Sequence, residues 1–107
     1  MPMTTLDELK LLTAWESEPV LAEAELDDLL AAASVADAGG RSPDDDGWAP
    51  TYDLNAAAAK AWLIKAARAA ASVDEAAEGP ATSKVFDNCR AMARFFLRKK
   101  NLSIITK

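Results

Sequence analysis

The sequence of 107 residues contains no histidine and only one cysteine, Cys89. Without histidine, the chain lacks the usual general base at neutral pH and the commonest metal-binding side chain. A single cysteine excludes an intramolecular disulfide and favours a reducing compartment such as the cytosol. Cys89 falls among regularly spaced apolar residues, so we expect a small core residue rather than a reactive thiol. We therefore expect neither an enzyme nor a cofactor-binding protein.

Long apolar runs are also missing from the chain. No stretch approaches the roughly 18 residues needed to span a bilayer, and residues 1–8 show no basic segment followed by an apolar one. We expect neither export through a signal peptide nor insertion in a membrane. Apolar residues make up 50% of the sequence, which predicts a globular chain, and the length fits one domain with a modest core.

Acidic and basic side chains are divided unequally along the chain, which has a net charge of −5. Residues 1–54 carry 13 acidic and 2 basic side chains (net −11), whereas residues 55–107 carry 4 acidic and 10 basic ones (net +6). This division permits head-to-tail contacts between copies, an acidic partner for the basic half, or an acidic surface that keeps nucleic acid away. Any single charge is more simply explained as part of a solvated helix face.

Two short helices are predicted in the acidic half. Thr5 and Glu8 form a capping-box pattern followed by leucines at helical spacing, which predicts a helix over about residues 5–15. A second helix is predicted over about residues 23–37, because leucines recur on one side and acidic residues on the other. The glycine pair that follows ends it.

Residues 41–50 hold two prolines, a glycine and three successive aspartates, which predicts a long solvated acidic loop. The three aspartates are Asp44, Asp45 and Asp46. They lack the alternating oxygen ligands and the terminal glutamate of an EF-hand, so we expect no metal site here.

An alanine-dense helix is predicted to begin near Leu54, because Asp53 can accept hydrogen bonds from the first free backbone N–H groups. It runs some twenty residues, to Ser72 or Val73, before a connection over residues 74–81. Its small side chains allow neighbouring helices to approach closely, including helices of a second subunit.

This helix has a polar and a buried face. The polar face consists of Lys60, Lys65, Arg68 and Ser72. Trp62 shares the opposite, buried side with three alanines. They are Ala59, Ala66 and Ala69.

The clearest helix pattern starts at Thr82 or Ser83 and continues to about residue 97. Apolar residues at i, i+4, i+7 and i+11 predict one buried stripe, made of Val85, Cys89, Met92 and Phe96. On the opposite side, arginines at successive i+4 steps form a ladder that two lysines extend. We call this set the arginine ladder: Arg90, Arg94, Arg98, Lys99 and Lys100.

Residues 101–107 are rich in β-branched side chains and lack helical periodicity, which predicts an extended tail or a frayed end. Exposing Leu102, Ile104 and Ile105 would be unfavourable for an isolated monomer. Such a tail can add as a strand to a partner's sheet edge, or it can fold back onto the chain's own helices. The sequence leaves both alternatives open.

Several patterns are distinctive in combination. They are the Tyr-Asp-Leu-Asn-Ala-Ala start at Tyr52, the Trp-x-x-Lys-Ala-Ala continuation at Trp62, Ser-Lys-Val-Phe from Ser83 and Met-Ala-Arg-Phe-Phe from Met92. With them the chain resembles the head-to-tail connector (adaptor) proteins of long-tailed bacteriophages, over about residues 20–98. It departs from them in having no aromatic residue before Asp74 and a lysine, Lys84, where members commonly have glutamine.

The resemblance implies a small all-α four-helix bundle over residues 1–100, with residues 101–107 as an extended docking tail. It implies a ring, usually of twelve copies, beneath the portal protein of a filled capsid. The ring extends the DNA channel and joins the next neck, stopper or tail-completion protein. Genomic DNA passes through without sequence-specific binding, and no membrane is involved. The expected location is the virion neck, and the host cytoplasm during assembly.

On this interpretation, one set of residues forms subunit or portal contacts and another faces the channel. The contact set is Trp48, Tyr52, Trp62, Ala66, Arg90, Arg94, Arg98, Lys99, Lys100, Leu102, Ile104 and Ile105. The candidate channel-facing acids are Glu23, Glu25, Asp27, Asp28, Asp44, Asp45 and Asp46. Carboxylates lining a channel repel phosphate and limit sticking as DNA slides through.

An alternative is a DNA-binding packaging or regulatory protein that uses the arginine ladder to contact phosphates. The strongly acidic first half and the lack of a helix-turn-helix pattern weigh against it. An enzyme would need a base or nucleophile among carboxylates, lysines or Cys89, and no constellation singles one out.

Overall fold

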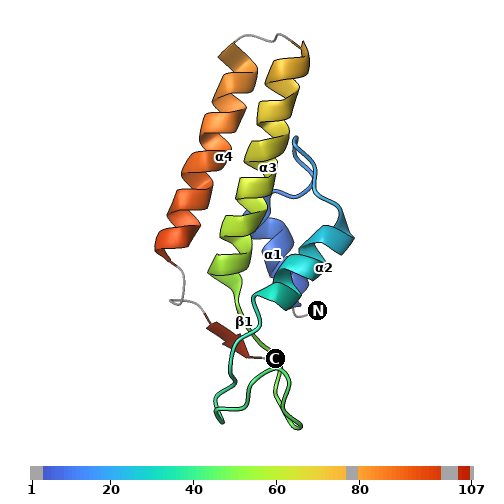
Figure 1. The fold of residues 1–107 in the computed structure, drawn as a ribbon, viewed down its shortest axis with the longest axis vertical. Helices are drawn as coiled ribbons and strands as arrows, with labels where there is room; N and C mark the ends of the chain where they lie inside the picture. The colour runs from blue at the N-terminus through green and yellow to red at the C-terminus, as the bar shows by residue number, and fades with distance from the viewer. Residues whose placement is uncertain (1–3, 77–79, 100–103, 107) are drawn as a thin grey trace.

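The computed structural model describes residues 4–76, 80–99 and 104–106. These residues form a small all-α fold with one short antiparallel sheet (Figure 1). The helices are α1 (Thr5–Thr13), α2 (Glu23–Ala32), α3 (Leu54–Ala76) and α4 (Pro80–Arg98), and the strands are β1 (Thr51–Asp53) and β2 (Ile104–Thr106). The all-α class predicted from the sequence is therefore confirmed.

The longest helix, α3, is the centre of the fold. It forms an antiparallel hairpin with α4 along the long axis of the molecule, while α1 and α2 pack against α3 in the half nearer the sheet (Figure 1). The molecule is elongated, with principal extents of 52, 27 and 25 Å. Because α3 lies between α4 and α2, the outer faces of these two helices belong to opposite flanks of the molecule (Figure 1).

Helix α1 begins at Thr5, as predicted, and ends at Thr13, two residues before the predicted end, but its cap is one residue earlier than the sequence predicts. Thr4 is the N-cap: its hydroxyl accepts from Asp7 N at 3.0 Å, and Asp7 Oδ2 accepts from Thr4 N at 3.3 Å. The predicted pair of Thr5 and Glu8 was therefore wrong by one position, and Thr5 is buried instead. The aspartate serves the reciprocal role that a glutamate usually fills in a capping box.

Helix α2 ends at Ala32, five residues before the predicted end at residue 37. The following residues leave the helix because their backbone pairs with β1. Asp53 N donates to Ala33 O at 2.9 Å, and Val35 N donates to Thr51 O at 2.9 Å. Hydrogen bonds to a strand distant in sequence thus override the helical preference of an alanine-rich segment.

Helix α3 begins at Leu54, as predicted, and Asp53 Oδ1 accepts a hydrogen bond from Ala56 N at 3.1 Å. The predicted cap is confirmed. The far end was wrong, because α3 continues to residue 76. Helix α4 starts at Pro80 rather than at Thr82 or Ser83, and proline suits a first helical position because its missing N–H would have no partner there.

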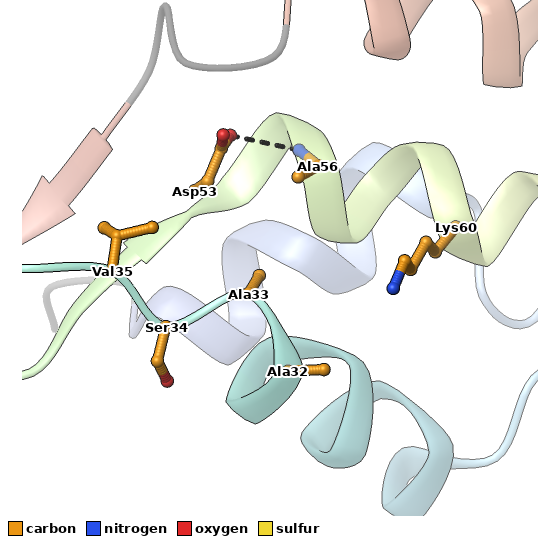
Figure 2. A pocket seen from close by; sticks show the side chains of 7 residues that line it. All are labelled: Ala32, Ala33, Ser34, Val35, Asp53, Ala56 and Lys60. Carbon is orange, nitrogen blue, oxygen red and sulfur yellow. Dashed lines mark hydrogen bonds between the residues drawn. The ribbon is translucent and has the colours of Figure 1, made fainter. Parts of the chain in front are cut away.

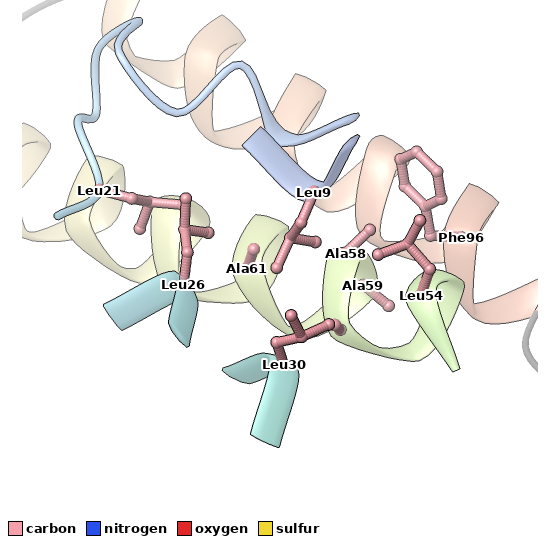
Figure 3. Packing of buried hydrophobic residues seen from close by; sticks show 10 residues of the cluster. Leu9, Leu21, Leu26, Leu30, Leu54, Ala58, Ala59, Ala61 and Phe96 are labelled. Carbon is pink, nitrogen blue, oxygen red and sulfur yellow. The ribbon is translucent and has the colours of Figure 1, made fainter. Parts of the chain in front are cut away.

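The core lies where α1 and α2 meet α3, with α4 contributing at the sheet end (Figure 3). Its large side chains are Leu9, Leu21, Leu26, Leu30, Leu54 and Phe96, and α3 supplies Ala57, Ala58, Ala59 and Ala61. All are buried. The alanines fill little volume, so leucines from α1 and α2 reach close to the α3 backbone.

The C-terminal segment supplies β2, which pairs antiparallel with β1 in the register Thr51 to Thr106, Tyr52 to Ile105 and Asp53 to Ile104. An extended segment was predicted, and the structure confirms it for residues 104–106. Its pairing partner here is neither another protein nor the chain's own helices, but the chain's own β1. Residues 100–103 and 107 of the predicted tail, including Lys100 and Leu102, lie outside the described residues.

Candidate assembly surfaces

The arginine ladder lies on the solvent side of α4. Cys89, Ala93 and Phe96 are buried on the other side of this helix, which confirms the predicted apolar stripe. The side chains of Arg90, Arg94, Arg98 and Lys99 are all exposed.

Two cations of the ladder rest on aromatic rings of the same helix. The Arg90 guanidinium lies 5.8 Å from the Phe86 ring centroid, and Lys99 Nζ lies 4.7 Å from that of Phe95. Contacts of this kind hold a side chain in place without neutralising its charge. The guanidinium groups therefore remain available for an acidic surface or for phosphate.

Two acids of α2 are paired within the chain. Glu23 accepts from Lys10 Nζ on α1, and Glu25 makes two contacts with Arg68 on α3, one of them 3.0 Å long. Arg68 and the backbone N–H of Ala22 lower the pKa of Glu25 to about 2. These carboxylates tie α2 to its neighbours, which removes them from the set of unpaired acids that the sequence suggested for the channel.

The remaining predicted acids are exposed. They are Asp27 and Asp28 on α2 and Asp44, Asp45 and Asp46 in the loop before β1. Asp45 is partly engaged, since its Oδ2 accepts from Ser42 N at 2.9 Å and from Ser42 Oγ at 3.1 Å. The other four keep their carboxylates toward solvent.

The acidic loop is organised by Asp37, which the sequence analysis placed at the end of a helix. Its side chain is buried and accepts backbone hydrogen bonds from Gly39 and Arg41, each at 2.9 Å, and from Ala49 at 2.8 Å. These bonds lower the pKa of Asp37, with Ala49 contributing most. An aspartate two residues before glycine is a known turn pattern and was the available signal.

Trp48 and Tyr52, which were predicted to form subunit or portal contacts, pack within the loop before β1. Trp48 Nε1 donates to Val35 O at 2.9 Å, and the Trp48 and Tyr52 rings meet edge to face with centroids 6.0 Å apart. Both side chains are half-buried. Each therefore offers only part of its surface to a second subunit.

The predicted buried face of α3 is largely confirmed. Ala59, Ala66 and Ala69 are each 2% exposed, and Trp62 is half-buried with its Nε1 donating to Leu12 O at 3.0 Å. Ala66 is thus enclosed by its own chain. Its assignment to a subunit interface is wrong, because no surface of that side chain is left for a partner.

The environment of Lys65 was predicted wrongly from the sequence. The residue was assigned to the polar face of α3, yet it is 1% exposed. Its Nζ donates to Ala14 O at 2.8 Å and to Ser17 O at 2.9 Å, and lies 5.2 Å from the Trp62 ring centroid. The ammonium therefore fastens the segment between α1 and α2 to α3.

Burial lowers the pKa of Lys65, while the charges of Cys89 and Glu18 act in the opposite direction. Burial likewise raises the pKa of the Cys89 thiol, which keeps it protonated and confirms its predicted place in the core. A buried lysine near a cysteine is reminiscent of covalent catalysis. Here, however, the ammonium is engaged by two carbonyl oxygens and has no route to a substrate.

A small open pocket of about 190 Å³ lies between the end of α2 and the start of α3 (Figure 2). Its lining is Ala32, Ala33, Ser34, Val35, Asp53, Ala56 and Lys60. Asp53 caps α3, and Ser34 Oγ donates to Ala31 O at 2.7 Å. The pocket therefore holds one exposed cation, Lys60, but no nucleophile paired with a base.

No protein-family model, curated protein or solved structure matches this chain. Within the described ranges, no group of three or more acidic or cysteine side chains is arranged to hold a metal ion. Over the same residues, no helix combines the length and apolar character needed to cross a bilayer. The connector resemblance thus rests on the sequence patterns, and the structure adds the placement of charge around the helical frame.

Proposed function

We propose that this chain is a structural head-to-tail adaptor of a tailed phage. In this role, copies form a ring, of about twelve subunits by the family resemblance, beneath the portal at the virion neck. The ring continues the DNA channel and carries the next neck, stopper or tail-completion protein. Assembly takes place in the host cytoplasm.

The observation that carries this proposal is the exposed arginine ladder. Arg90, Arg94 and Arg98 recur at i+4 spacing along α4 and are all exposed. Helix α4 lies on the opposite side of α3 from α2, which carries exposed carboxylates (Figure 1). A protein that meets copies of itself and a portal needs specific surfaces more than a reactive centre, and charged faces provide orientation and choice of partner. The pocket between α2 and α3 is small and open to solvent, and no nucleophile paired with a base lines it.

Exposed carboxylates suit the channel part of this role. Asp44 and Asp46 in the loop before β1 are exposed, and a lumen of like charge repels the phosphates of passing DNA. In this proposal DNA passes through the ring without being bound.

The test is binding to the portal oligomer encoded by the same phage genome. We expect the two proteins to sediment together, and electron microscopy to show added ring density below the portal. Arg94→Glu with Arg98→Glu should weaken this association. Lys60→Glu with Lys84→Glu makes the same change in net charge at exposed positions outside the arginine ladder and serves as control. A wild-type chain that neither binds the portal nor forms rings would contradict the proposal.

The same ladder supports one second candidate, a protein that binds duplex DNA through phosphates. A gel-shift assay separates the two functions. Tight, salt-sensitive duplex binding by the wild-type chain, abolished by Arg94→Glu with Arg98→Glu, would favour DNA binding. Unshifted DNA together with portal binding would favour the adaptor.

A further inference from the structure

The outer flank of α4 combines charge with exposed apolar surface. Phe95 is 39% exposed and Leu97 57% exposed. Phe95 lies three residues before Arg98 and Leu97 three residues after Arg94, so the two apolar side chains flank the arginine pair on its two sides. We call these four residues the α4 face. Large apolar side chains in water favour association, because covering them releases ordered solvent.

The outer flank of α2 has the complementary character. Ala24 and Ala31 are both exposed and lie seven residues apart, so they form a flat ridge along one side of the helix. Asp27 and Asp28 stand on either side of that ridge and are also exposed. We call these four residues the α2 face. Its small side chains leave room for bulky ones, and its carboxylates match guanidinium groups.

Helices α4 and α2 lie on opposite sides of α3 (Figure 1). Because both faces consist of solvent-exposed residues of these helices, they belong to opposite flanks of the molecule. A surface on one flank that fits a different surface on the other flank produces a heterologous, head-to-tail contact. Such contacts repeat from copy to copy and generate closed rings when the rotation between copies closes. A two-fold dimer would instead bring a face against itself, and here that places arginine on arginine.

We infer that the α4 face of one copy docks on the α2 face of a second copy of this chain. Arg94 and Arg98 lie over the alanine ridge and pair with Asp27 and Asp28 on its two sides, while Phe95 and Leu97 cover the margins of the contact. The apolar contact adds affinity, since exposed ion pairs contribute little individually. The charges fix register and exclude the two-fold arrangement. This inference rests on the proposed function, which it deepens by naming the surfaces that form the ring.

The test is charge reversal and its rescue, measured by sedimentation velocity. Arg94→Glu with Arg98→Glu, and separately Asp27→Arg with Asp28→Arg, should each weaken self-association by about tenfold or more, because each brings like charges together. Mixing the two variants should restore assembly, since every contact in an alternating ring is again between opposite charges. Combining all four substitutions in one chain should restore it as well.

Matched controls separate this contact from a general effect of charge. Asp44→Arg with Asp46→Arg makes the same change in net charge as the α2 variant, on the exposed loop, and should leave self-association unchanged. Circular dichroism establishes that each variant keeps its helices. Added salt should weaken wild-type association by screening the charges.

Three outcomes would overturn the inference: a wild-type chain that stays monomeric, reversals that leave association intact, or reversals that are not rescued by each other. Portal binding, measured on the same variants, keeps this result distinct from failure of the proposed function. If the chain binds the portal but the two charge-reversed variants do not restore each other's assembly, only the assignment of the α4 face and the α2 face is contradicted. If they do restore assembly but the chain does not bind the portal, only the adaptor function is contradicted.

Discussion

The ammonium of Lys65 donates a hydrogen bond to the backbone carbonyl of Ala14, 2.8 Å away and 51 residues earlier in the chain. Ala14 has a left-handed backbone conformation (φ 47°) at the end of α1. The cation therefore meets the C-terminal end of a helix, where carbonyl groups lack intrahelical partners and the helix dipole favours positive charge.

Lys65→Met should destabilise the protein. The substitution keeps an apolar stem of similar length but removes the Lys65 donor from the carbonyls of Ala14 and Ser17, at a cost of about 1–3 kcal/mol. Ala14 O keeps its second donor, Ser17 N at 3.0 Å. Urea denaturation measures the change. Lys60→Met, at an exposed position on the same helix, should shift stability by no more than about 0.5 kcal/mol. Equal effects of the two variants would contradict the buried role of Lys65.

Ala66→Leu should overpack the interior beside α3. Ala66 is 2% exposed, and inserting methylene groups at such a site costs about 1–3 kcal/mol. Ala67→Leu is the matched control, because Ala67 is exposed and the substitution places the same larger side chain on the surface. Thermal melting compares them. Unchanged melting of Ala66→Leu would show that the site has room to spare.

The Glu25–Arg68 pair should make stability depend on acid pH. The folded protein lowers the pKa of Glu25 from 4.5 to about 2, so the unfolded chain takes up a proton at higher pH than the folded one. The stabilisation is therefore present above about pH 4.5 and is lost as the pH falls towards 2. For this partly exposed pair we expect about 0.5–1 kcal/mol.

Glu25→Gln should accordingly be less stable than wild type at pH 7, and the difference should shrink towards pH 2. Denaturation at a series of pH values tests this trend. Asp28→Asn, an exposed acid on the same helix, should show no comparable trend. A gap between Glu25→Gln and wild type that is constant with pH would rule out the ion pair as its cause.

Truncation after Lys100 should leave the helices folded, because the core residues among the described part of the chain precede that point. It removes β2, so the backbone groups of β1 that face β2 become accessible to water. Hydrogen exchange should become faster at Tyr52, whose register partner is Ile105, whereas Asp53 N keeps its bond to Ala33 O. Portal binding should decrease. Ile105→Pro, which opposes Tyr52 in the register, should reproduce the exchange effect without deleting the segment. Unaltered exchange in both variants would contradict the pairing.

Features set by neighbouring residues were predictable from the sequence. The Asp53 cap depends on a carboxylate one residue before a helix, and the stripe of α4 depends on spacing alone. Asp37 carried a turn pattern that points to its role. The cap and the stripe depend on residues close in sequence, so the order of amino acids specifies them directly. For Asp37 this holds only for the bonds from Gly39 and Arg41, because the bond from Ala49 spans 12 residues.

Features set by distant partners were not predictable in the same way. The end of α2 depends on pairing with β1, and the burial of Lys65 depends on where the segment after α1 is packed. Helical periodicity assigns a lysine to the polar face whenever its neighbours there are polar. Only the tertiary fold reveals that the turn after α1 covers Lys65 and that its carbonyl groups accept hydrogen bonds from this lysine.

Two cations of α3, Lys65 and Arg68, bind the connection between α1 and α2 through carbonyl oxygens of Ala14, Ser17 and Val20. Carbonyl groups are the same whatever side chain the residue carries. The connection is therefore recognised by the path of its main chain, and its amino acids are free to vary wherever that path is kept. Related chains should differ widely across residues 14–18 while retaining a cation at position 65, so divergence in this segment is a poor measure of structural distance.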